Sequence, residues 1–226
     1  MDNLTPNHHP VNKNGLLFWM SYMNTGSVSA LGTWKDYSGN GNNGTLVNDA
    51  FIDNNGFNGD GTSDWVNFEN VVNPTVHMTL NEWIYIDVTT GTAGLYGTVS
   101  KENGNNGYGI TLLGSNYGGQ TNEAEAFIGV SGGARYADAN VSLNINQWYM
   151  LTMTYDGSSL NIYIDGVLKN TTSVTGSIVS GTADLGIGKT PTIGRYFNGK
   201  VANVQIYDRA WSAGEVKRNY LKNKRG

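Results

Sequence analysis

Apolar and polar residues alternate along the last third of the chain with the period of two that is typical of extended strands. In residues 148–155 one face carries Tyr149, Leu151, Met153 and Tyr155, and residues 160–165 repeat the alternation. An Asp-Gly pair follows each run, at 156–157 and 165–166, and such pairs favour tight hairpin turns because glycine tolerates a positive φ. The pattern therefore predicts consecutive strands joined by tight turns.

Similar short runs are spread over the rest of the chain. Strands are expected near residues 15–20, 44–52, 63–69, 77–87, 95–101, 107–113, 124–130, 148–155, 160–165, 183–187 and 199–207. Glycine is abundant, with 31 residues in 226, and a chain so rich in turn residues favours an all-β sandwich over helices. We therefore expect an antiparallel two-sheet jelly roll, with its sheets about 10 Å apart.

A short helix is expected at the C-terminus. Ser212-Ala-Gly-Glu215 has the form of a capping box, in which the serine and the glutamate satisfy each other's backbone amides. Val216 and Tyr220 are four residues apart and can share the buried side of this helix. At the other end, Pro6 and Pro10 lie in a polar stretch, so residues 1–14 are expected to be a flexible arm and residues 15–226 one domain.

Five blocks occur in an order that is specific for one family. They are the strand at 15–19, the Asp-Tyr-Ser-Gly-Asn-Gly-Asn segment from residue 36, the Phe-x-Gly-x-Gly hairpin at 57–66, the Thr- and Trp-containing strand at 78–83, and the closing strand at 199–207. The chain resembles the laminin-G-like branch of the concanavalin A-like lectin/glucanase superfamily. The resemblance implies a jelly roll whose ligands meet rim loops or a concave outer face.

Sugar binding requires aromatic rings that stack on C–H faces and polar groups that pair with hydroxyls. Aromatic rings, side-chain amides and a guanidinium group with several N–H donors occur in or beside Gly- and Asn-rich loops. The candidate ligand-binding residues are Tyr108, Asn116, Tyr117, Arg135 and Tyr136. The alternative is that these aromatic residues are ordinary strand residues, because tyrosine and tryptophan favour sheets.

Calcium binds six to eight oxygen ligands, which carboxylates and amides supply. Candidate ligands lie in two turn-rich segments, and they are Asp36, Asn40, Asp60 and Asp64. Many relatives hold a structural Ca²⁺ with an acid of the closing strand, but Ala202 and Asn203 replace the two acids of that pattern here. The alternative is that the four residues cap turns through backbone amides.

Catalytic chemistry is not expected. Glucanases of the superfamily carry a Glu-x-Asp-x-x-Glu strand, whereas this chain has Glu123-Ala-Glu125 with alanine in the middle and no third acid. Glu123 and Glu125 share a strand face, which we expect to be solvated. The chain has no cysteine, and His77 stands alone outside the arm. The sequence therefore predicts a protein that is not an enzyme.

The formal net charge of −4 conceals an asymmetry, because five of the 14 cationic residues lie in the last ten positions and all 18 acidic residues lie elsewhere. An acidic body argues against nucleic-acid partners. The basic tail complements the dipole at the end of the helix or, alternatively, touches an acidic partner. No apolar run is long enough to insert into a membrane, and no signal peptide is visible.

These observations lead to two hypotheses. The first is a recognition module that binds a glycan or a cell surface and acts outside the cell or on a virion. The second is a capsid decoration or other virion structural protein, in which the sandwich is an exposed knob and the arm or the tail docks to other virion proteins. Saturable binding to a glycan array would favour the first, and a repeated copy number in purified particles would favour the second.

Overall fold

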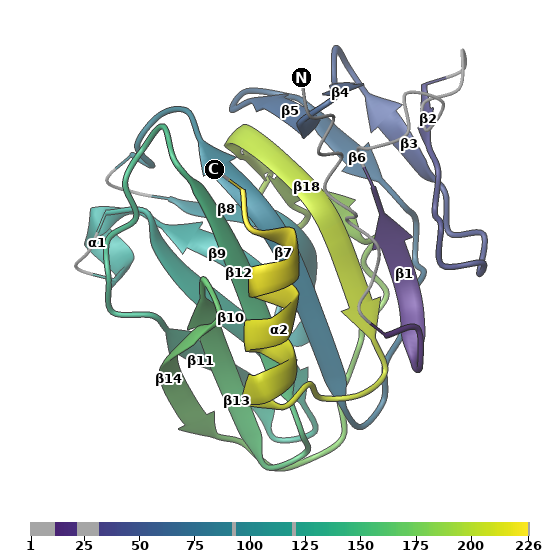
Figure 1. The fold of residues 1–226 in the computed structure, drawn as a ribbon, viewed down its shortest axis with the longest axis vertical. Coiled ribbons are helices and arrows are strands. Elements are labelled where there is room, and N and C mark those ends of the chain that lie inside the picture. The colour runs from purple at the N-terminus through teal and green to yellow at the C-terminus, as the bar shows by residue number, and fades with distance from the viewer. Residues whose placement is uncertain (1–11, 22–31, 92–93, 119–120, 226) are drawn as a thin grey trace.

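The computed structural model describes residues 12–21, 32–91, 94–118 and 121–225. Within them, two large antiparallel sheets form a sandwich (Figure 1). The first sheet contains, in spatial order, β14 (Val167–Ser173), β13 (Ser159–Ile164), β12 (Trp148–Tyr155), β7 (Met78–Ile86), β18 (Asn198–Tyr207), β5 (Gly56–Asp60) and β4 (Phe51–Asp53), and β1 (Leu16–Met20) also pairs with β18. This architecture confirms the predicted all-β jelly roll.

The second sheet faces the first across the core. It contains, in spatial order, β11 (Gly133–Asp138), β10 (Glu123–Val130), β9 (Asn106–Leu113), β8 (Leu95–Asn103), β15 (Gly186–Ile187), β6 (Trp65–Asn67), β3 (Gly44–Val47) and β2 (Thr33–Trp34). A small hairpin of β16 (Lys189–Thr190) and β17 (Arg195–Tyr196) lies beside β8. The remaining elements are the one-turn α1 (Ser115–Gly118) and α2 (Ala213–Asn223).

Period-two alternation decides which side chains enter the core. The face of β12 that carries Leu151 and Met153 points between the sheets, as the sequence predicts, and both side chains are fully buried. The turn from β13 to β14 also follows the prediction, because Asp165 and Gly166 have φ values of 52° and 78°. Positive φ at both central residues is the signature of the hairpin turn that matches strand twist.

One carboxyl group lies inside this core. Glu82 lies between Leu80 and Ile84 on β7 and is fully buried, and burial raises its pKa to about 8. Oγ1 of Thr98 lies 2.5 Å from Oε1 of Glu82 and 3.0 Å from the carbonyl oxygen of Ile110. Because one hydroxyl has one proton for these two acceptors, the arrangement fits a protonated Glu82 that donates to Thr98.

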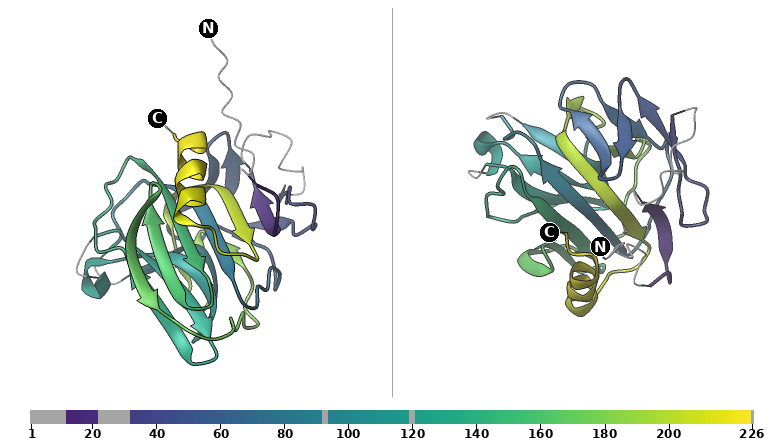
Figure 2. Two further views of the ribbon diagram at one scale, coloured as in Figure 1. Left: turned by 60° about the horizontal axis from the view of Figure 1, so that its bottom comes forward. Right: turned by 45° about the horizontal axis from the view of Figure 1, so that its top comes forward.

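A second apolar cluster lies on the outer face of the first sheet. We call it the outer cluster, and its buried members are Trp83, Met150, Tyr163, Ala202, Tyr207, Trp211 and Val216. The left view of Figure 2 shows that α2 stands against this outer face. Because Trp148 and Tyr220 also pack against the cluster, the helix makes this outer face a second buried layer.

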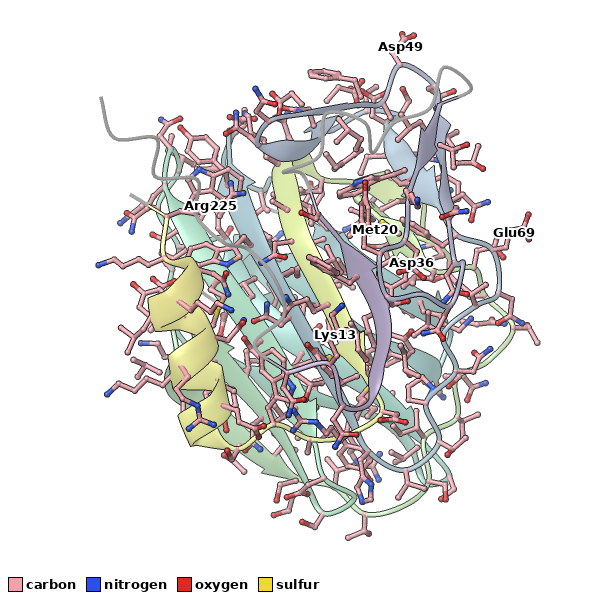
Figure 3. The ribbon with its side chains drawn as sticks, turned by 45° about the vertical axis from the view of Figure 1, so that its right-hand side comes forward. Lys13, Met20, Asp36, Asp49, Glu69 and Arg225 are labelled. Atoms are coloured by element: carbon pink, nitrogen blue, oxygen red, sulfur yellow. The ribbon has the colours of Figure 1, made fainter. Side chains whose placement is uncertain are left out.

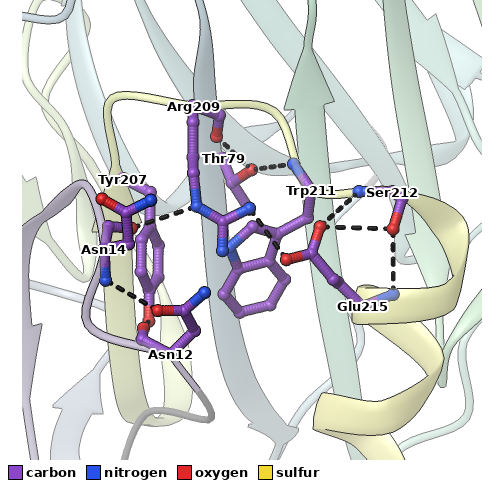
Figure 4. A network of polar contacts seen from close by, with 8 residues as sticks. All are labelled: Asn12, Asn14, Thr79, Tyr207, Arg209, Trp211, Ser212 and Glu215. Carbon is purple, nitrogen blue, oxygen red and sulfur yellow. Dashed lines mark hydrogen bonds and ion pairs between the residues drawn. The ribbon is translucent and has the colours of Figure 1, made fainter.

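Polar contacts fix the start of α2 (Figure 4). Ser212 and Glu215 form the predicted capping box. Arg209 forms an ion pair of 2.9 Å with Glu215 and donates from Nε to the carbonyl oxygen of Asn14, while the hydroxyl of Tyr207 donates to the carbonyl oxygen of Asn12. Residues 12–14 of the expected arm are therefore attached to the domain, and residues 1–11 lie outside the described residues.

The sequence missed some strands and merged others. β11 and β14 are edge strands, and exposed residues interrupt their hydrophobic pattern. β5 contains two glycines in five residues, which weakens the strand signal. The strand expected at 44–52 is divided between the two sheets, because Asn48 turns the chain with a φ of 59°. Residues 115–118, expected as part of a turn, form α1.

Candidate functional site

Aromatic side chains gather where the outer cluster reaches solvent. Trp83, Tyr85 and Trp148 occupy outward positions of β7 and β12, because their neighbours Ile84 and Tyr149 point into the core. α2 adds Tyr220 from above the sheet. Together they surround a cavity of about 390 Å³, which we call the aromatic groove, and its lining residues are Trp83, Tyr85, Asn146, Gln147, Trp148, Asp165, Tyr220, Lys224 and Arg225.

The rings of the aromatic groove form two pairs. Trp83 and Tyr220 are nearly parallel, with centroids 5.9 Å apart and planes at 21°, whereas Tyr85 and Trp148 are tilted by 57° at 5.5 Å. The guanidinium carbon of Arg225 lies 3.9 Å from the centroid of the Trp148 ring, close enough for a cation–π contact. Figure 3 shows Arg225 beyond the upper end of α2, so the helix brings this cation to the groove.

Polar groups border these rings. Asn146 and Gln147 are exposed, and the hydroxyl of Tyr85 lies 3.5 Å from Oδ1 of Asn146. Oδ1 of Asp165 accepts a hydrogen bond of 2.8 Å from the backbone nitrogen of Met150, and burial raises the pKa of Asp165. The groove thus offers stacking surfaces beside amides, a carboxylate and cations, which is the combination that orients a small polar ligand.

The structure does not support Tyr108 as a ligand-binding residue. It lies on the inward face of β9 with Ile110 and Leu112 and is fully buried. Its hydroxyl donates a hydrogen bond of 2.7 Å to the carbonyl oxygen of Val72. The prediction was wrong because Tyr108 follows a Gly/Asn-rich turn but already belongs to the core face of the next strand.

The other predicted ligand-binding residues are not brought together. Arg135 lies opposite the core residue Ile128 and Tyr136 lies opposite Phe127, so these neighbours point to opposite faces of the sheet. Arg135 donates to the carbonyl oxygens of its own hairpin, at Ala134 and Gly132. Asn116 is exposed on α1, and Tyr117 belongs to the same helix, but its side chain lies outside the described residues.

The expected calcium ligands are engaged as turn caps. The two carboxylate oxygens of Asp36 accept hydrogen bonds from the backbone nitrogens of Trp19, Ser38 and Asn42 and from the hydroxyl of Ser38. In Figure 3, Asp36 lies beside Met20, to which an isolated β-bridge joins it. The side-chain amide of Asn40 donates to the carbonyl oxygens of Leu16 and Leu17.

The second predicted calcium segment also serves its own turn. Oδ1 of Asp60 accepts from the backbone nitrogens of Thr62, Ser63 and Asp64, and burial raises the pKa of Asp64. At the position where relatives have an acid, Oδ1 of Asn203 accepts from the indole of Trp19. No cluster of three His, Asp or Glu side chains that could hold a metal occurs in the described part of the chain. Calcium binding stays a prediction.

Glu123 and Glu125 share the outer face of β10, as predicted, but the expectation that this face is solvated was wrong. Their exposed fractions are 0% and 9%. Glu123 accepts a 2.6 Å hydrogen bond from the backbone nitrogen of Asn140, and Glu125 faces Asp138 across the β10–β11 ladder. Burial, and after it the neighbouring Asp138 carboxylate, raises the pKa of Glu125 to about 8, so this acid holds a proton at neutral pH.

Sequence reasoning placed Trp83 and Trp148 on strands but did not assign them a role. A signal was present, because Trp83 and Tyr85 alternate with isoleucines on one strand, and Trp148 begins another. Outward aromatic residues on two strands would point to an exposed ring cluster only if the strands were known to be neighbours. That pairing, Trp148 opposite Tyr85, appears only in the folded ladder.

Two stacked antiparallel sheets with a groove on an outer face define an all-β sandwich of the lectin-like jelly-roll type. The family model of the concanavalin A-like lectin/glucanases superfamily matches residues 60–217, well over half of the chain. The chain belongs to this superfamily. No curated protein sequence matches it significantly.

Solved structures share the fold at low sequence identity. Domain 4 of AbnA, a GH43 extracellular arabinanase from Geobacillus stearothermophilus, in complex with arabinotriose, matches with a TM-score of 0.66 and 15% identity over 92% of this chain and 100% of that one. The binding domain of Paraclostridial Mosquitocidal Protein 1 matches with a TM-score of 0.69 and 17% identity over 92% of this chain and 52% of that one.

A botulinum neurotoxin also shares the fold. Botulinum neurotoxin type C, whose cell entry is dependent upon interaction with two ganglioside molecules, matches with a TM-score of 0.70 and 14% identity over 94% of this chain. This chain spans about half the length of that toxin chain, 52% of it. At these identities the likeness establishes the fold alone. Among the described helices, none has the length and apolar character needed to cross a membrane.

Proposed function

We propose that the protein is a non-catalytic glycan-binding module and that the aromatic groove is its binding site. The observation that carries this proposal is the convergence of four aromatic side chains from β7, β12 and α2 on one cavity of about 390 Å³. Sugar rings present C–H faces that stack on indole and phenol rings, and their hydroxyls pair with amides and carboxylates. The groove offers both kinds of partner within one outer face of the sandwich.

The charges of the groove suit a broad range of sugars. Lys224 and Arg225 contribute two cations, and Asp165 contributes a carboxylate that is partly withdrawn from solvent. A hydroxyl-rich ligand can donate to Asp165 and accept from the cations, while an acidic sugar gains attraction from Lys224 and Arg225. We therefore expect both uncharged and acidic saccharides to enter the groove.

The named neighbours support a binding role outside the cell. The arabinanase is extracellular, and its domain 4 was solved with arabinotriose. The type DC neurotoxin binding domain was solved both with SialylT and with rat synaptotagmin II. Each of these chains contains this fold, over its whole length in the arabinanase domain and over 52% of the neurotoxin chain, and each was solved with a saccharide or a protein receptor. We therefore place the ligand on a glycan or cell surface.

The buried acids support a role without catalysis. A retaining glycosidase keeps its two carboxyl groups about 5–5.5 Å apart, so that one attacks while the other donates a proton. Glu125 instead lies opposite Asp138 in the β10–β11 ladder, and burial together with the Asp138 carboxylate raises the pKa of Glu125 to about 8. Because Glu125 then holds a proton at neutral pH, it is not available as a nucleophile.

Glycan-array binding with matched variants tests the groove. The array carries arabinotriose, other uncharged oligosaccharides and sialylated ones. We expect Trp148→Ala and Tyr85→Ala each to weaken binding by at least about tenfold, which corresponds to about 1.4 kcal/mol. Phe51→Ala is the control, because Phe51 is a 54% exposed aromatic residue on β4 outside the groove. Unchanged binding by both groove variants, with wild-type melting curves, would refute the site.

Two finer predictions accompany this proposal. Virion display would make the protein a particle-surface lectin, and the copy number of the protein in purified particles tests it. Structural calcium would raise the melting temperature by mass action. A melting curve that does not change at millimolar Ca²⁺ would remove calcium from the proposal.

A further inference from the structure

A second aromatic surface lies on the other sheet. Trp65 is an outward residue of β6, because the next residue, Val66, is fully buried in the core. The outer face of the second sheet points away from the outer face of the first, where the aromatic groove lies. Trp65 is half-buried, so part of its indole is accessible to a ligand.

Lys189 links Trp65 to a second ring. Its Nζ lies 4.0 Å from the centroid of Trp65 and 5.5 Å from that of Tyr196, which is the residue paired with Lys189 in the β16–β17 hairpin. Contacts of this kind hold a cation over ring faces. The lysine therefore marks the midpoint of a continuous row, Trp65–Lys189–Tyr196, along the surface of the second sheet.

The row contributes lining residues to two cavities, Trp65 and Lys189 to one and Tyr196 to the other. The larger, of about 380 Å³, is lined by Trp65, Glu102, Asn103, Thr182, Ala183, Asp184, Lys189, Pro191 and Thr192. The smaller, of about 170 Å³, is lined by Gly61, Val88, Thr89, Thr90, Gly91, Tyr96, Tyr196, Phe197 and Asn198. We call the row and its two cavities the Trp65 surface.

The polar groups of the Trp65 surface differ from those of the aromatic groove. The larger cavity has two carboxylates, Glu102 and Asp184, and one cation, and burial raises the pKa of Glu102. In the same cavity the side-chain amide of Asn103 donates to the hydroxyl of Thr182 at 3.0 Å. The smaller cavity has no charged lining residue among those described. An acidic sugar would meet two carboxylates here, whereas an uncharged sugar finds acceptors, a donor and ring faces.

We propose that the Trp65 surface is a second saccharide-binding site, selective for uncharged oligosaccharides and independent of the aromatic groove. Because Lys189 of one cavity lies beside Tyr196 of the other, one saccharide chain can place sugar rings in both, so affinity increases with chain length until both are filled. One molecule of the protein then holds two saccharide chains on opposite faces of its sandwich. Such bivalent binding cross-links glycans and raises avidity without any new contact.

Calorimetry with single and double variants tests this second site. The probes are arabinobiose, arabinohexaose, other uncharged hexasaccharides and hexasaccharides with uronic acid units. For wild type we expect two molecules of uncharged hexasaccharide per protein, and one molecule of the acidic probe. Trp65→Ala and Trp148→Ala should each leave one site for the uncharged probe, and the double variant should leave none. At the Trp65 surface the hexasaccharide should bind at least about tenfold more tightly than the disaccharide.

Cross-linking gives a second readout. Wild type should cluster beads that carry the uncharged hexasaccharide, and neither single variant should do so. Lys189→Glu places a third carboxylate on the half-buried row, and it should abolish the second site even if Trp65→Ala perturbs folding. Phe51→Ala serves again as the exposed aromatic control.

The results separate the two sites. If Trp65→Ala and Lys189→Glu keep the wild-type stoichiometry and still cluster beads, the second site does not exist. The same conclusion follows if no uncharged hexasaccharide binds. If Trp148→Ala changes nothing while Trp65→Ala removes binding, the Trp65 surface stands and the proposed role of the aromatic groove fails.

Discussion

The two apolar layers of this molecule, the core between the sheets and the outer cluster, differ in how completely they are shielded from solvent. The core between the sheets is closed on both faces, and residues such as Leu151 and Met153 have no exposed surface. The outer cluster is covered by α2 on one side only, and beyond the helix it reaches solvent in the aromatic groove through the partly buried Trp148 and Tyr220. The inner layer therefore stabilises the fold, whereas the outer layer supports the fold and also forms the proposed ligand surface.

The largest expected effect is a pH-dependent change in stability caused by Glu82, the acid inside the core. An unfolded chain releases the proton of Glu82 near pH 4.5, but the folded chain releases it near pH 8. The folded state therefore loses stability as the pH rises from about 4.5 to about 8, by about 1.4 kcal/mol for each unit of pKa difference and about 5 kcal/mol at most. Glu82→Gln removes this loss, so its free energy of unfolding should exceed that of wild type at pH 9 but not at pH 5.

Urea unfolding at pH 5 and pH 9 measures this difference. Glu69→Gln is the control, because it removes the same charge from an exposed residue. If Glu82→Gln and wild type lose stability in parallel between the two pH values, Glu82 does not hold its proton in the core. The inner layer would then tolerate a charge, which would weaken the contrast with the outer layer.

Shortening a side chain in the core between the sheets should cause the next largest loss of stability. Leu151 is fully buried on β12, so Leu151→Ala leaves a cavity and should cost about 3 kcal/mol of unfolding free energy. Chemical denaturation measures this loss. Because Leu151 points away from the aromatic groove, the folded fraction of the variant should bind ligand with wild-type affinity. A tenfold loss of affinity in fully folded Leu151→Ala would contradict the separation of the two layers.

A substitution in the outer cluster should lower both the stability of the fold and the affinity for ligand. Val216 is fully buried where α2 meets the sheet, and Val216→Ala should cost about 2 kcal/mol of unfolding free energy. Tyr220 lies one helical turn further along, so a looser helix moves one wall of the groove. We expect a several-fold loss of ligand affinity, measured under conditions in which the variant is fully folded. Unchanged affinity would mean that the sheet residues alone form the site.

The inner layer was more predictable from the sequence than the outer one, for a physical reason. The core face of β12 follows from alternation within eight residues, and the hairpin turns follow from local Asp-Gly pairs. These signals are local, because a strand shows its buried face in its own sequence. The edge strands β11 and β14 carry no such face, and their sequences gave no signal.

The candidate site depends on contacts between distant segments. Trp148 lies opposite Tyr85 in the β12–β7 ladder, which pairs residues more than 60 positions apart. Tyr220, on the C-terminal helix α2, stacks on Trp83. No local pattern determines which strands become neighbours. Tyr108 shows the converse error, in which a residue was assigned to the ligand site wrongly. The Gly- and Asn-rich sequence before it suggested a solvent-exposed loop, but Tyr108 lies on the core face of its strand and is fully buried.

The smallest effect concerns the cap that begins α2. Oγ of Ser212 accepts a hydrogen bond of 3.3 Å from the backbone nitrogen of Glu215, and the Glu215 carboxylate accepts one of 2.9 Å from the backbone nitrogen of Ser212. Ser212→Ala removes the first bond and should cost about 1 kcal/mol of unfolding free energy. Ser212→Thr keeps a hydroxyl at the cap and should lose less.

Thermal unfolding and ligand affinity of the aromatic groove, measured on the same variants, show whether the cap affects stability alone or also binding. The cap lies at the end of α2 that is remote from Lys224 and Arg225, so Ser212→Ala should change ligand affinity by less than about twofold. Equal losses of stability for the alanine and threonine variants would show that the hydroxyl is not the stabilising group. A large loss of affinity with a small loss of stability would show that the helix transmits changes at its start to the groove, and that the outer layer acts as one rigid unit.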